Sequence, residues 1–301
     1  MVNCVSLAVI GGSGVYNIEG ARVLDRRQIK TPFGDPSDEV TIVDFDGTQV
    51  AFLPRHGRGH RVTPTEIPVR ANLWALKSLG VKSLIAISAV GSLQEEYAPG
   101  DWVLPNQVID RTKGRVQTFF GDGIVGHVGF ADPFCNDLSA IVEANLRESG
   151  VAKIHTGATY LCMEGPAFST RAESHLYRSW GCGIIGMTAI PEAKLAREAE
   201  IAYALIGMVT DYDCWREEEE AVTVDAVMAV MKKNSEGIKR VLPRVLQSIP
   251  KDFSSPAHEA ARFAIISALD ELKPEVRQRL ELFYGKYWGK SGNPEKGGGH
   301  A

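Results

Sequence analysis

Apolar runs alternate with amphipathic stretches along most of the chain, and this alternation predicts its secondary structure. Compact runs rich in Val, Ile and Leu predict strands over 5–10, 41–45, 50–54, 83–88, 100–105, 157–163, 182–187 and 202–210. Apolar residues at helical spacing predict helices over 66–80, 138–150, 169–180, 189–200 and 223–246. Strands that alternate with helices indicate an α/β fold built in layers.

The pattern changes near residue 250, where a Pro- and Ser-rich stretch over 250–256 predicts a linker. Two helical segments are expected after it, over 258–272 and 274–289, and the Gly-rich polar end is expected to be disordered. The chain is therefore divided into a catalytic domain over residues 1–250 and a remainder over 251–301, which comprises the linker, a helical C-terminal extension and a disordered tail.

The overall composition is that of an ordinary soluble globular protein. Apolar residues make up 44% and charged residues 23% of the 301 positions, and the formal net charge is −4. This balance offers no basic field to attract nucleic acid or an anionic membrane, and no apolar run reaches the roughly 18 residues of a spanning helix. The N-terminus lacks the basic region of a signal peptide, and the five cysteines form no CxxC pair. We expect a cytoplasmic protein with reduced thiols and no metal cluster.

Small polar residues stand beside glycines where three predicted strands end. "VIGGSGVYN" carries Ser13 in a turn that can bind an anion or be only a tight turn, and Asn17 stands where a dinucleotide fingerprint needs its third glycine. Ser88 and Ala89 end another strand, the usual place for ligand contacts, and Thr188 precedes a helix whose free N–H groups favour an anion. Together these positions predict one phosphate site.

The segment "PRHGRGHR" concentrates basic side chains directly after a strand. Such a cluster repels itself unless an anion neutralises it, and Arg55 is well shaped for bidentate contact with phosphate. The alternative is a solvated basic loop. A nucleic-acid patch is disfavoured because the chain has no second basic stripe with interleaved aromatics. His56 and His60 lack the spacing of a zinc helix, so no metal site is expected.

Two further motifs suit a planar ligand. In "MEGPAFSTRAE" the Gly165-Pro166 corner presents Phe168, which can stack on a flat ring or pack in the core. In "MVTDYDCW" an apolar strand ends in Asp211 and Asp213, and acids are costly to bury without a partner. We expect these acids to contact a different part of the ligand from the phosphate.

The motifs "GGSG", "PRHGRGH", "AVGSL", "EGPAFSTRAE", "MTAIPEAKLAREA" and "TDYDCW" occur in the order seen in the trimeric purine nucleoside phosphorylase family. Over residues 5–250 the chain resembles this family, and most closely its 5′-methylthioadenosine phosphorylase branch. The resemblance implies a single α/β domain with a central mixed sheet flanked by helices, a homotrimer, and phosphorolysis of the bond between a purine and C1′ of the sugar. It also implies inorganic phosphate as co-substrate, with no cofactor and no metal.

The resemblance assigns roles to residues of this chain by position. Met187 would contact the sugar hydroxyls through its backbone, Phe168 would lie against sugar and base, and the catalytic pair Asp211 and Asp213 would face the purine. The implied phosphate-binding set is Ser13, Arg55, His56, Ser88, Ala89 and Thr188. The implied nucleoside-binding set is Phe168, Met187, Ser169, Val224, His60 and Ile185.

Three positions favour a 6-amino purine that carries a 5′-methylthio group. Family members that use 6-oxopurines generally have Asn at the position of Asp211, Glu at that of Ser169 and His at that of Val224. The resemblance thus implies phosphorolysis of S-methyl-5′-thioadenosine in purine and methionine salvage. The open alternatives are a methylthioinosine or 6-oxopurine nucleoside phosphorylase, a hydrolytic nucleosidase, which has no use for a phosphate site, and a non-catalytic nucleotide-binding module, which gives the acids no role.

The predicted extension carries many apolar and aromatic side chains between residues 257 and 289, too many to remain in water. The family resemblance suggests that this segment docks across or beside the trimer interface and covers the methylthio group. The alternative is that it covers only the surface of its own subunit.

Overall fold

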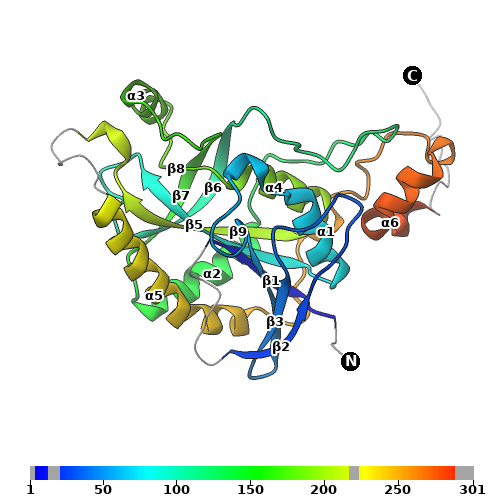
Figure 1. Cartoon of the computed structure of the whole chain (residues 1–301), viewed down its shortest axis with the longest axis horizontal. Helices are drawn as coiled ribbons and strands as arrows, with labels where there is room; N and C mark the ends of the chain where they lie inside the picture. The colour runs from blue at the N-terminus through cyan, green and yellow to red at the C-terminus, as the bar shows by residue number, and fades with distance from the viewer. Residues whose placement is uncertain (1–3, 13–20, 217–223, 289–301) are drawn as a thin grey trace, which may run out of the picture.

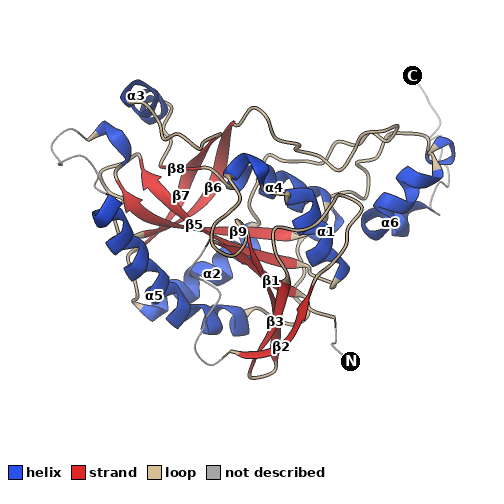
Figure 2. Cartoon of the chain, in the orientation of Figure 1, coloured by secondary structure: helices blue, strands red, loops and turns tan. Residues whose placement is uncertain are grey.

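The structure is a computed structural model that describes residues 4–12, 21–216 and 224–288, and its centre is one mixed sheet. The strands are β1 (Leu7–Gly11), β2 (Arg22–Arg27), β3 (Val40–Phe45), β4 (Thr48–Pro54), β5 (Ser83–Ser92), β6 (Trp102–Arg111), β7 (Ile154–Met163), β8 (Ile184–Gly186) and β9 (Ala202–Asp211). They follow the order β2-β3-β4-β1-β5-β8-β7-β6-β9 across the sheet. Since β9 pairs with both β6 and β5, the strands from β5 to β9 close into a ring (Figure 2).

Helices cover both faces of this sheet. In the described part of the chain they are α1 (Val69–Ser78), α2 (Asn136–Ser149), α3 (Arg171–Ser179), α4 (Ala189–Glu198), α5 (Val224–Ser248) and α6 (Pro274–Trp288). α2 and α5 pack against each other and against β9, whereas α1 and α4 pack together on the opposite face (Figure 1). α6 contacts α1 at one end of the molecule. No described helix is both long and apolar enough to cross a bilayer.

The central strands are apolar over most of their length because both of their faces are largely buried. β1 pairs in parallel with β4 and β5, and β5 pairs in parallel with β9. Alternate residues of β1 enter different cores: Ala8 and Ile10 pack toward α1 and α4, and Leu7 and Val9 pack toward α2 and α5. The carboxyl ends of these four parallel strands therefore meet at one edge of the sheet.

The elements expected from the hydrophobic pattern are confirmed, with one strand missed. All eight predicted strands and all five predicted helices before residue 250 are present, and Gly150 ends α2 in the left-handed conformation with φ of 61°. The sequence analysis did not predict β2. Its residues, "RVLDRR", lie at the sheet edge and are mostly polar and partly exposed, so they lack the apolar run that marked the other strands.

The helix predicted over 258–272 is wrong. This segment contains only 3₁₀ turns, at Pro256–Glu259 and Leu269–Glu271. Between them the backbone pairs with the distant segment 125–127: His127 N donates to Ala264 O at 2.9 Å, and Ile266 N donates to Val125 O at 3.0 Å. These tertiary hydrogen bonds replace the helical ones. The predicted tail disorder lies outside the described residues.

The second helix of the extension, α6, is confirmed and packs on its own subunit. Leu280, Phe283 and Tyr284 are buried in the same core as α1 and α4. The Phe283 ring lies 4.5 Å from that of Phe119, and the Tyr284 hydroxyl donates to Glu198 O at 3.1 Å. The apolar surface of α6 is therefore covered within one chain.

Candidate active site

A cavity of about 310 Å³ opens at the edge of the sheet where the four parallel strands end. This is the usual position of ligand sites in α/β sheets. The predicted site residues that line it are Arg55, His56, His60, Ser88, Ala89, Phe168, Ile185, Met187, Thr188, Asp211 and Asp213. Residues from distant parts of the sequence, from Arg55 after β4 to Asp213 after β9, are thus brought into one cavity.

Three predicted site residues are not placed in this cavity. Ser13 lies outside the described residues. Val224 is the first residue of α5, and its side chain also lies outside what the structure describes. Ser169 does not line the cavity; its hydroxyl donates to Met163 Sδ at 3.7 Å, and its carbonyl accepts from Cys214 Sγ at 3.2 Å.

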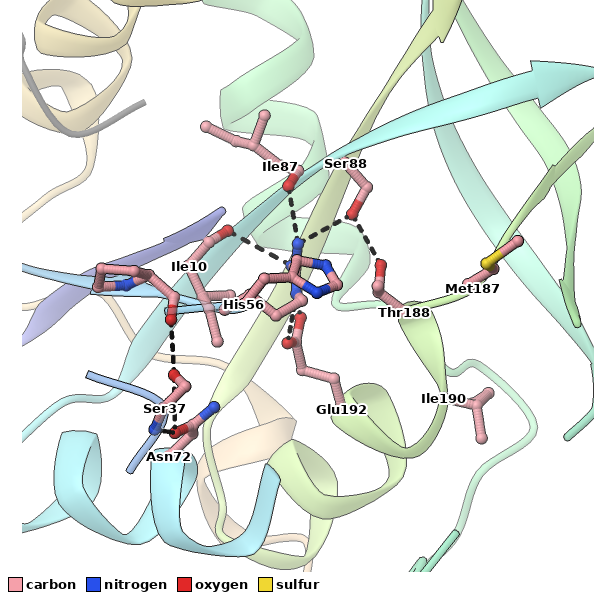
Figure 3. A network of polar contacts seen from close by, with 12 residues as sticks. Ile10, Ser37, His56, Asn72, Ile87, Ser88, Met187, Thr188, Ile190 and Glu192 are labelled. Atoms are coloured by element: carbon pink, nitrogen blue, oxygen red, sulfur yellow. Dashed lines mark hydrogen bonds and ion pairs between the residues drawn. The ribbon is translucent and has the colours of Figure 1, made fainter. Parts of the chain in front are cut away.

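Arg55 is almost completely buried, and its N–H groups are engaged within the protein. Nε and Nη2 donate to the two carboxylate oxygens of Glu192, each at 2.9 Å. Nη1 donates to Ile87 O at 3.0 Å and to Ser88 Oγ at 3.2 Å, and Nη2 also donates to Ile10 O at 3.4 Å (Figure 3). Glu192, in the first turn of α4, is fully buried and balances the charge of the guanidinium.

Two hydroxyl groups meet beside this buried ion pair. Ser88 Oγ lies 3.0 Å from Thr188 Oγ1, at the point where β5 and the residue preceding α4 come together (Figure 3). Because Arg55 donates to Ser88 Oγ, the Ser88 proton is available to Thr188 or to a ligand. Thr188 lies just ahead of α4, in which Ile190 has extended dihedral angles (φ −113°, ψ 132°), so the continuous helical turns begin only at Pro191.

His56 is a neutral imidazole at neutral pH. Burial lowers its pKa to about 4, and the nearby Arg55 acts in the same direction against a hydrogen bond to Val62. Nδ1 lies 2.8 Å from Val62 O, a pure acceptor, so Nδ1 carries the proton and Nε2 keeps a lone pair. The ring stacks on His60, with centroids 4.2 Å apart.

Asp211 and Asp213 line the cavity farther along β5 than Ser88 does, because Asp211 pairs with Gly91, about 10 Å beyond Ser88 at about 3.3 Å per strand residue. Asp211 Oδ2 accepts from Thr210 Oγ1 at 2.6 Å, and its Oδ1 accepts from Asp213 N at 2.9 Å.

Asp213 Oδ2 is buried without a hydrogen-bond partner among the described residues. Burial raises the pKa of Asp213 and the neighbouring Asp211 adds to this effect, while the Ser174 hydroxyl and the Cys214 backbone act in the opposite direction. The pair thus combines a carboxylate that two protein hydrogen bonds hold in place and that keeps acceptor capacity with a carboxyl group that is able to hold a proton.

Apolar side chains form other parts of the cavity wall. Met187, Ile185, Met208 and Met231 line the cavity, and Phe168 projects from its loop with 84% of its surface exposed. The methionines of β9 and α5 were missed because core methionines at helical or strand spacing give no sequence signal of their own.

Asn234 of α5 also lines the cavity and was missed. It is buried, its Oδ1 accepts from Trp102 Nε1 at 3.1 Å, and its Nδ2 donates to Val209 O at 3.0 Å. A single amide on the apolar face of the predicted helix was the available signal. Among the described residues, no group of three or more His, Cys, Asp or Glu side chains is arranged to hold a metal ion.

Comparison with known proteins gives consistent matches over nearly the whole chain. A family model described as "Phosphorylase superfamily" matches residues 6–247. The S-methyl-5′-thioadenosine phosphorylase of Geobacter sulfurreducens is 51% identical over 93% of this chain and 98% of its own length. That of Koribacter versatilis is 49% identical over 94% and 97%.

Solved structures show the same likeness. A methylthioadenosine phosphorylase from an antarctic soil metagenomic library superposes with a TM-score of 0.90 at 46% identity, covering 94% of this chain and 99% of that one. A mutant of adenosine/methylthioadenosine phosphorylase from Schistosoma mansoni, solved in complex with methylthioadenosine, gives a TM-score of 0.80 at 35% identity, covering 86% and 96%.

Proposed function

The chain belongs to the phosphorylase superfamily, and from this membership and the two-ended cavity we propose that it is an S-methyl-5′-thioadenosine phosphorylase. It cleaves methylthioadenosine with inorganic phosphate to adenine and 5-methylthioribose 1-phosphate. The observation that carries the proposal is the single cavity that joins an end suited to an anion with an end that holds two acids of different character.

Phosphate binds at the Ser88–Thr188 end. The hydroxyls of Ser88 and Thr188 and the neutral His56 support this placement. His56 Nε2 can accept the proton of hydrogen phosphate, because that nitrogen keeps its lone pair. Arg55 acts mainly by holding Ser88 in place, since Glu192 balances its charge. Ser13 is proposed to complete this site.

The purine binds at the acid end. Asp211 accepts a hydrogen bond from the 6-amino group, and a protonated Asp213 donates to N7. When the C1′–N9 bond breaks, its electron pair moves into the purine, and the proton from Asp213 neutralises the leaving base. A phosphate oxygen then forms the new bond to C1′, which carries oxocarbenium character. Overall, the proton of hydrogen phosphate ends on adenine.

The sugar and its 5′-methylthio group lie between these ends. Met187 contacts the sugar hydroxyls through its backbone, and the apolar walls formed by Met208 and Met231 suit a thioether better than a hydroxyl, which would lose its water there. Phe168 covers the nucleoside, with His60, Ile185, Ser169 and Val224 contributing to the same pocket. No cofactor takes part.

We also propose a cytoplasmic homotrimer that acts in purine and methionine salvage. Exposed apolar side chains support an assembly: Phe263 is 87% exposed and Ile266 is 67% exposed, and hydrogen bonds fix their segment to 125–127. Such side chains are expected to be covered by a second copy of the chain. Sedimentation of the purified protein tests the trimer.

The direct test of the activity is release of free base from methylthioadenosine, adenosine, methylthioinosine and inosine, each with and without phosphate. We expect adenine from methylthioadenosine only when phosphate is present, and slower release from the other three nucleosides. Release of base without phosphate would identify a hydrolase. Preferred cleavage of methylthioinosine or inosine would identify the 6-oxopurine alternative.

A further inference from the structure

Arg115 lies on the loop after β6, outside the residues that line the cavity, and its side chain is only 3% exposed. All five of its N–H groups have acceptors. Nη1 donates to Met187 O at 2.6 Å and to Ile190 O at 2.7 Å. Nη2 donates to Glu164 O at 2.6 Å and to Met163 O at 3.4 Å, and Nε donates to Glu164 Oε1 at 3.2 Å. One guanidinium therefore ties the end of β7 to the turn that precedes α4.

Of the residues that supply these acceptors, Met163 and Met187 line the cavity and Glu164 follows Met163 directly, whereas Ile190 lies two residues beyond the cavity residue Thr188. Thr188 follows Met187 directly (Figure 3). In a trans peptide the C=O and the following N–H point in opposite directions. By holding the Met187 carbonyl, Arg115 thus also fixes the direction of the Thr188 N–H at the proposed phosphate end.

Glu164 extends the same connection to a third loop. Its carboxylate accepts from Thr65 Oγ1, next to the cavity residue Pro64, and from Lys113 N at 2.6 Å. Although partial burial acts to raise it, hydrogen bonds from Thr65, Lys113 and Arg115 lower the pKa of Glu164 to about 2. The carboxylate is thus ionised wherever the enzyme would work, and it balances the charge of Arg115.

We propose that Arg115 and Glu164 form a positioning pair, which sets the position of Met187 and Thr188, at the proposed sugar and phosphate sites, relative to the cavity residue Met163 at the end of β7. The proposal rests on the assigned phosphorylase activity. The planar fork of arginine can bind four carbonyl oxygens and one carboxylate oxygen at once, whereas a lysine ammonium has three donors on a flexible stem. The pair touches neither substrate and acts only through the loops.

Arg115→Lys tests this role by steady-state kinetics with methylthioadenosine and phosphate each varied in turn. Misplacement of reacting groups by about 1 Å can cost about 100-fold in rate, so we expect kcat/KM to fall about 100-fold and both KM values to rise about fivefold or more. Thermal unfolding and sedimentation establish that the variant is folded at the assay temperature. A purely structural role would lower the active fraction, and hence kcat, while both KM values stayed at the wild-type level. That result would overturn the proposal.

Arg197→Lys is the matched control. Arg197 also binds backbone carbonyls from a partly buried position, with Nη1 2.9 Å from Gly129 O and Nη2 bonded to Asp132 O, but neither carbonyl belongs to a residue that lines the cavity. We expect its KM values to stay within about twofold of wild type. If Arg197→Lys raised both KM values as much as Arg115→Lys, the effect would not be specific to the pair, and the proposal would fail.

Two further variants keep the proposal testable if Arg115→Lys does not fold. Glu164→Gln keeps the side-chain shape but places an amide N–H group where Thr65 Oγ1 or Lys113 N now donates to a carboxylate oxygen. Thr65→Val removes one hydrogen bond to the Glu164 carboxylate. Both variants should raise the two KM values together. The loss of kcat/KM in the double variant Arg115→Lys with Glu164→Gln should be smaller than the product of the losses in the two single variants. Unchanged KM values in Glu164→Gln and Thr65→Val, with active wild-type enzyme, would refute the positioning role alone. An inactive wild type would instead refute the assigned activity.

Discussion

Two acids in neighbouring positions are given different chemistry by their surroundings. Both oxygens of Asp211 accept hydrogen bonds from the protein, so this residue presents acceptor atoms in a fixed orientation. Asp213 is in the left-handed backbone region, with φ of 53°, and its Oδ2 is buried without a partner among the described residues. Burial favours its neutral form. An acceptor and a proton carrier within one pocket are what a leaving purine requires.

Asp211→Asn should change which purine the enzyme accepts. An amide can donate to O6 of a 6-oxopurine, whereas the carboxylate cannot, and an unpaired buried polar group costs about 1–3 kcal/mol, or about ten- to a hundredfold in rate. We expect kcat/KM for methylthioadenosine to fall by that factor and activity on methylthioinosine to rise. The ratio of the two kcat/KM values is the measurement. Asp44→Asn, the same substitution at a carboxylate that lies outside the cavity and pairs with Arg22, should leave the ratio unchanged. An unchanged ratio in Asp211→Asn would remove Asp211 from the base site.

The buried His56 should make stability depend on pH. Its pKa of about 4 is below the ordinary value of 6.5, so between these two pH values the unfolded chain binds more protons than the folded one. Stability should therefore rise as pH increases from about 4 to about 6.5, by about 1–2 kcal/mol after allowance for the partial solvent exposure of the ring. Denaturant unfolding at pH 4.5 and pH 7 measures this difference. His56→Gln should show a smaller difference, and an equal pH dependence would show that other groups cause it.

At the scale of elements, strand pairing places the ends of β5 and β9 side by side. Gly91 of β5 pairs with Asp211 of β9, and a register shift separates this pair from the preceding one, Val90 with Val209. The shift lets the β9 end turn its acids toward the cavity. Gly91 is needed here for space, because a Cβ at this position would lie 3.0 Å from Ile185 Cγ2 and 3.1 Å from Asp211 Oδ1.

Gly91→Ala should therefore impair catalysis more than folding. The added methyl group has to displace the Asp211 carboxylate or Ile185 by a few tenths of an ångström. We expect kcat/KM for methylthioadenosine to fall about tenfold or more, with a change in Tm of only a few degrees. Gly129→Ala is the control, since a Cβ there meets nothing within 4 Å. Wild-type kinetics in Gly91→Ala would mean that the Asp211 position is not constrained by β5.

At the scale of the whole molecule, the C-terminal extension has two parts with different surroundings. α6 is packed into the core of its own subunit through Leu280, Phe283 and Tyr284. The preceding segment exposes Phe263 and Ile266 while hydrogen bonds to 125–127 hold its backbone in place. α6 thus covers the surface of its own subunit, as the second alternative for the extension predicts. The segment that carries Phe263 and Ile266 is the part left to contact another copy of the chain.

Phe283→Ala and Phe263→Ala should separate these two roles. Phe283→Ala empties a core site and should lower the free energy of unfolding by about 3–5 kcal/mol without changing the preference for methylthioadenosine over adenosine. Phe263→Ala removes an exposed ring and should instead weaken the trimer or reduce that preference, as measured by sedimentation and by kcat/KM for the two nucleosides. If Phe263→Ala changed neither, the segment would have no part in assembly or in the site.

The sequence by itself determined the order of elements and the chemistry gathered at the strand ends. Hydrophobic periodicity is a local property, so buried strands and amphipathic helices were predictable residue by residue. The family motifs identified the cavity residues in advance, from the basic loop at Arg55 to the acids after β9. The extension was predicted less well, because the helical pattern over 258–272 could not reveal that this backbone would pair with 125–127.

Only the tertiary structure decided how those residues act on one another. Arg55 was expected to bind phosphate, and it lines the cavity; only the structure shows that Glu192, 137 positions away in the sequence, holds its guanidinium in a buried ion pair beside Ser88 and Thr188. The hydrogen bonds by which Arg115 joins the end of β7 to Met187 could likewise not be predicted from the sequence. In both cases the reason is physical: burial and hydrogen-bond partners depend on which distant segments meet, and these set the charge, the proton position and the orientation of each group.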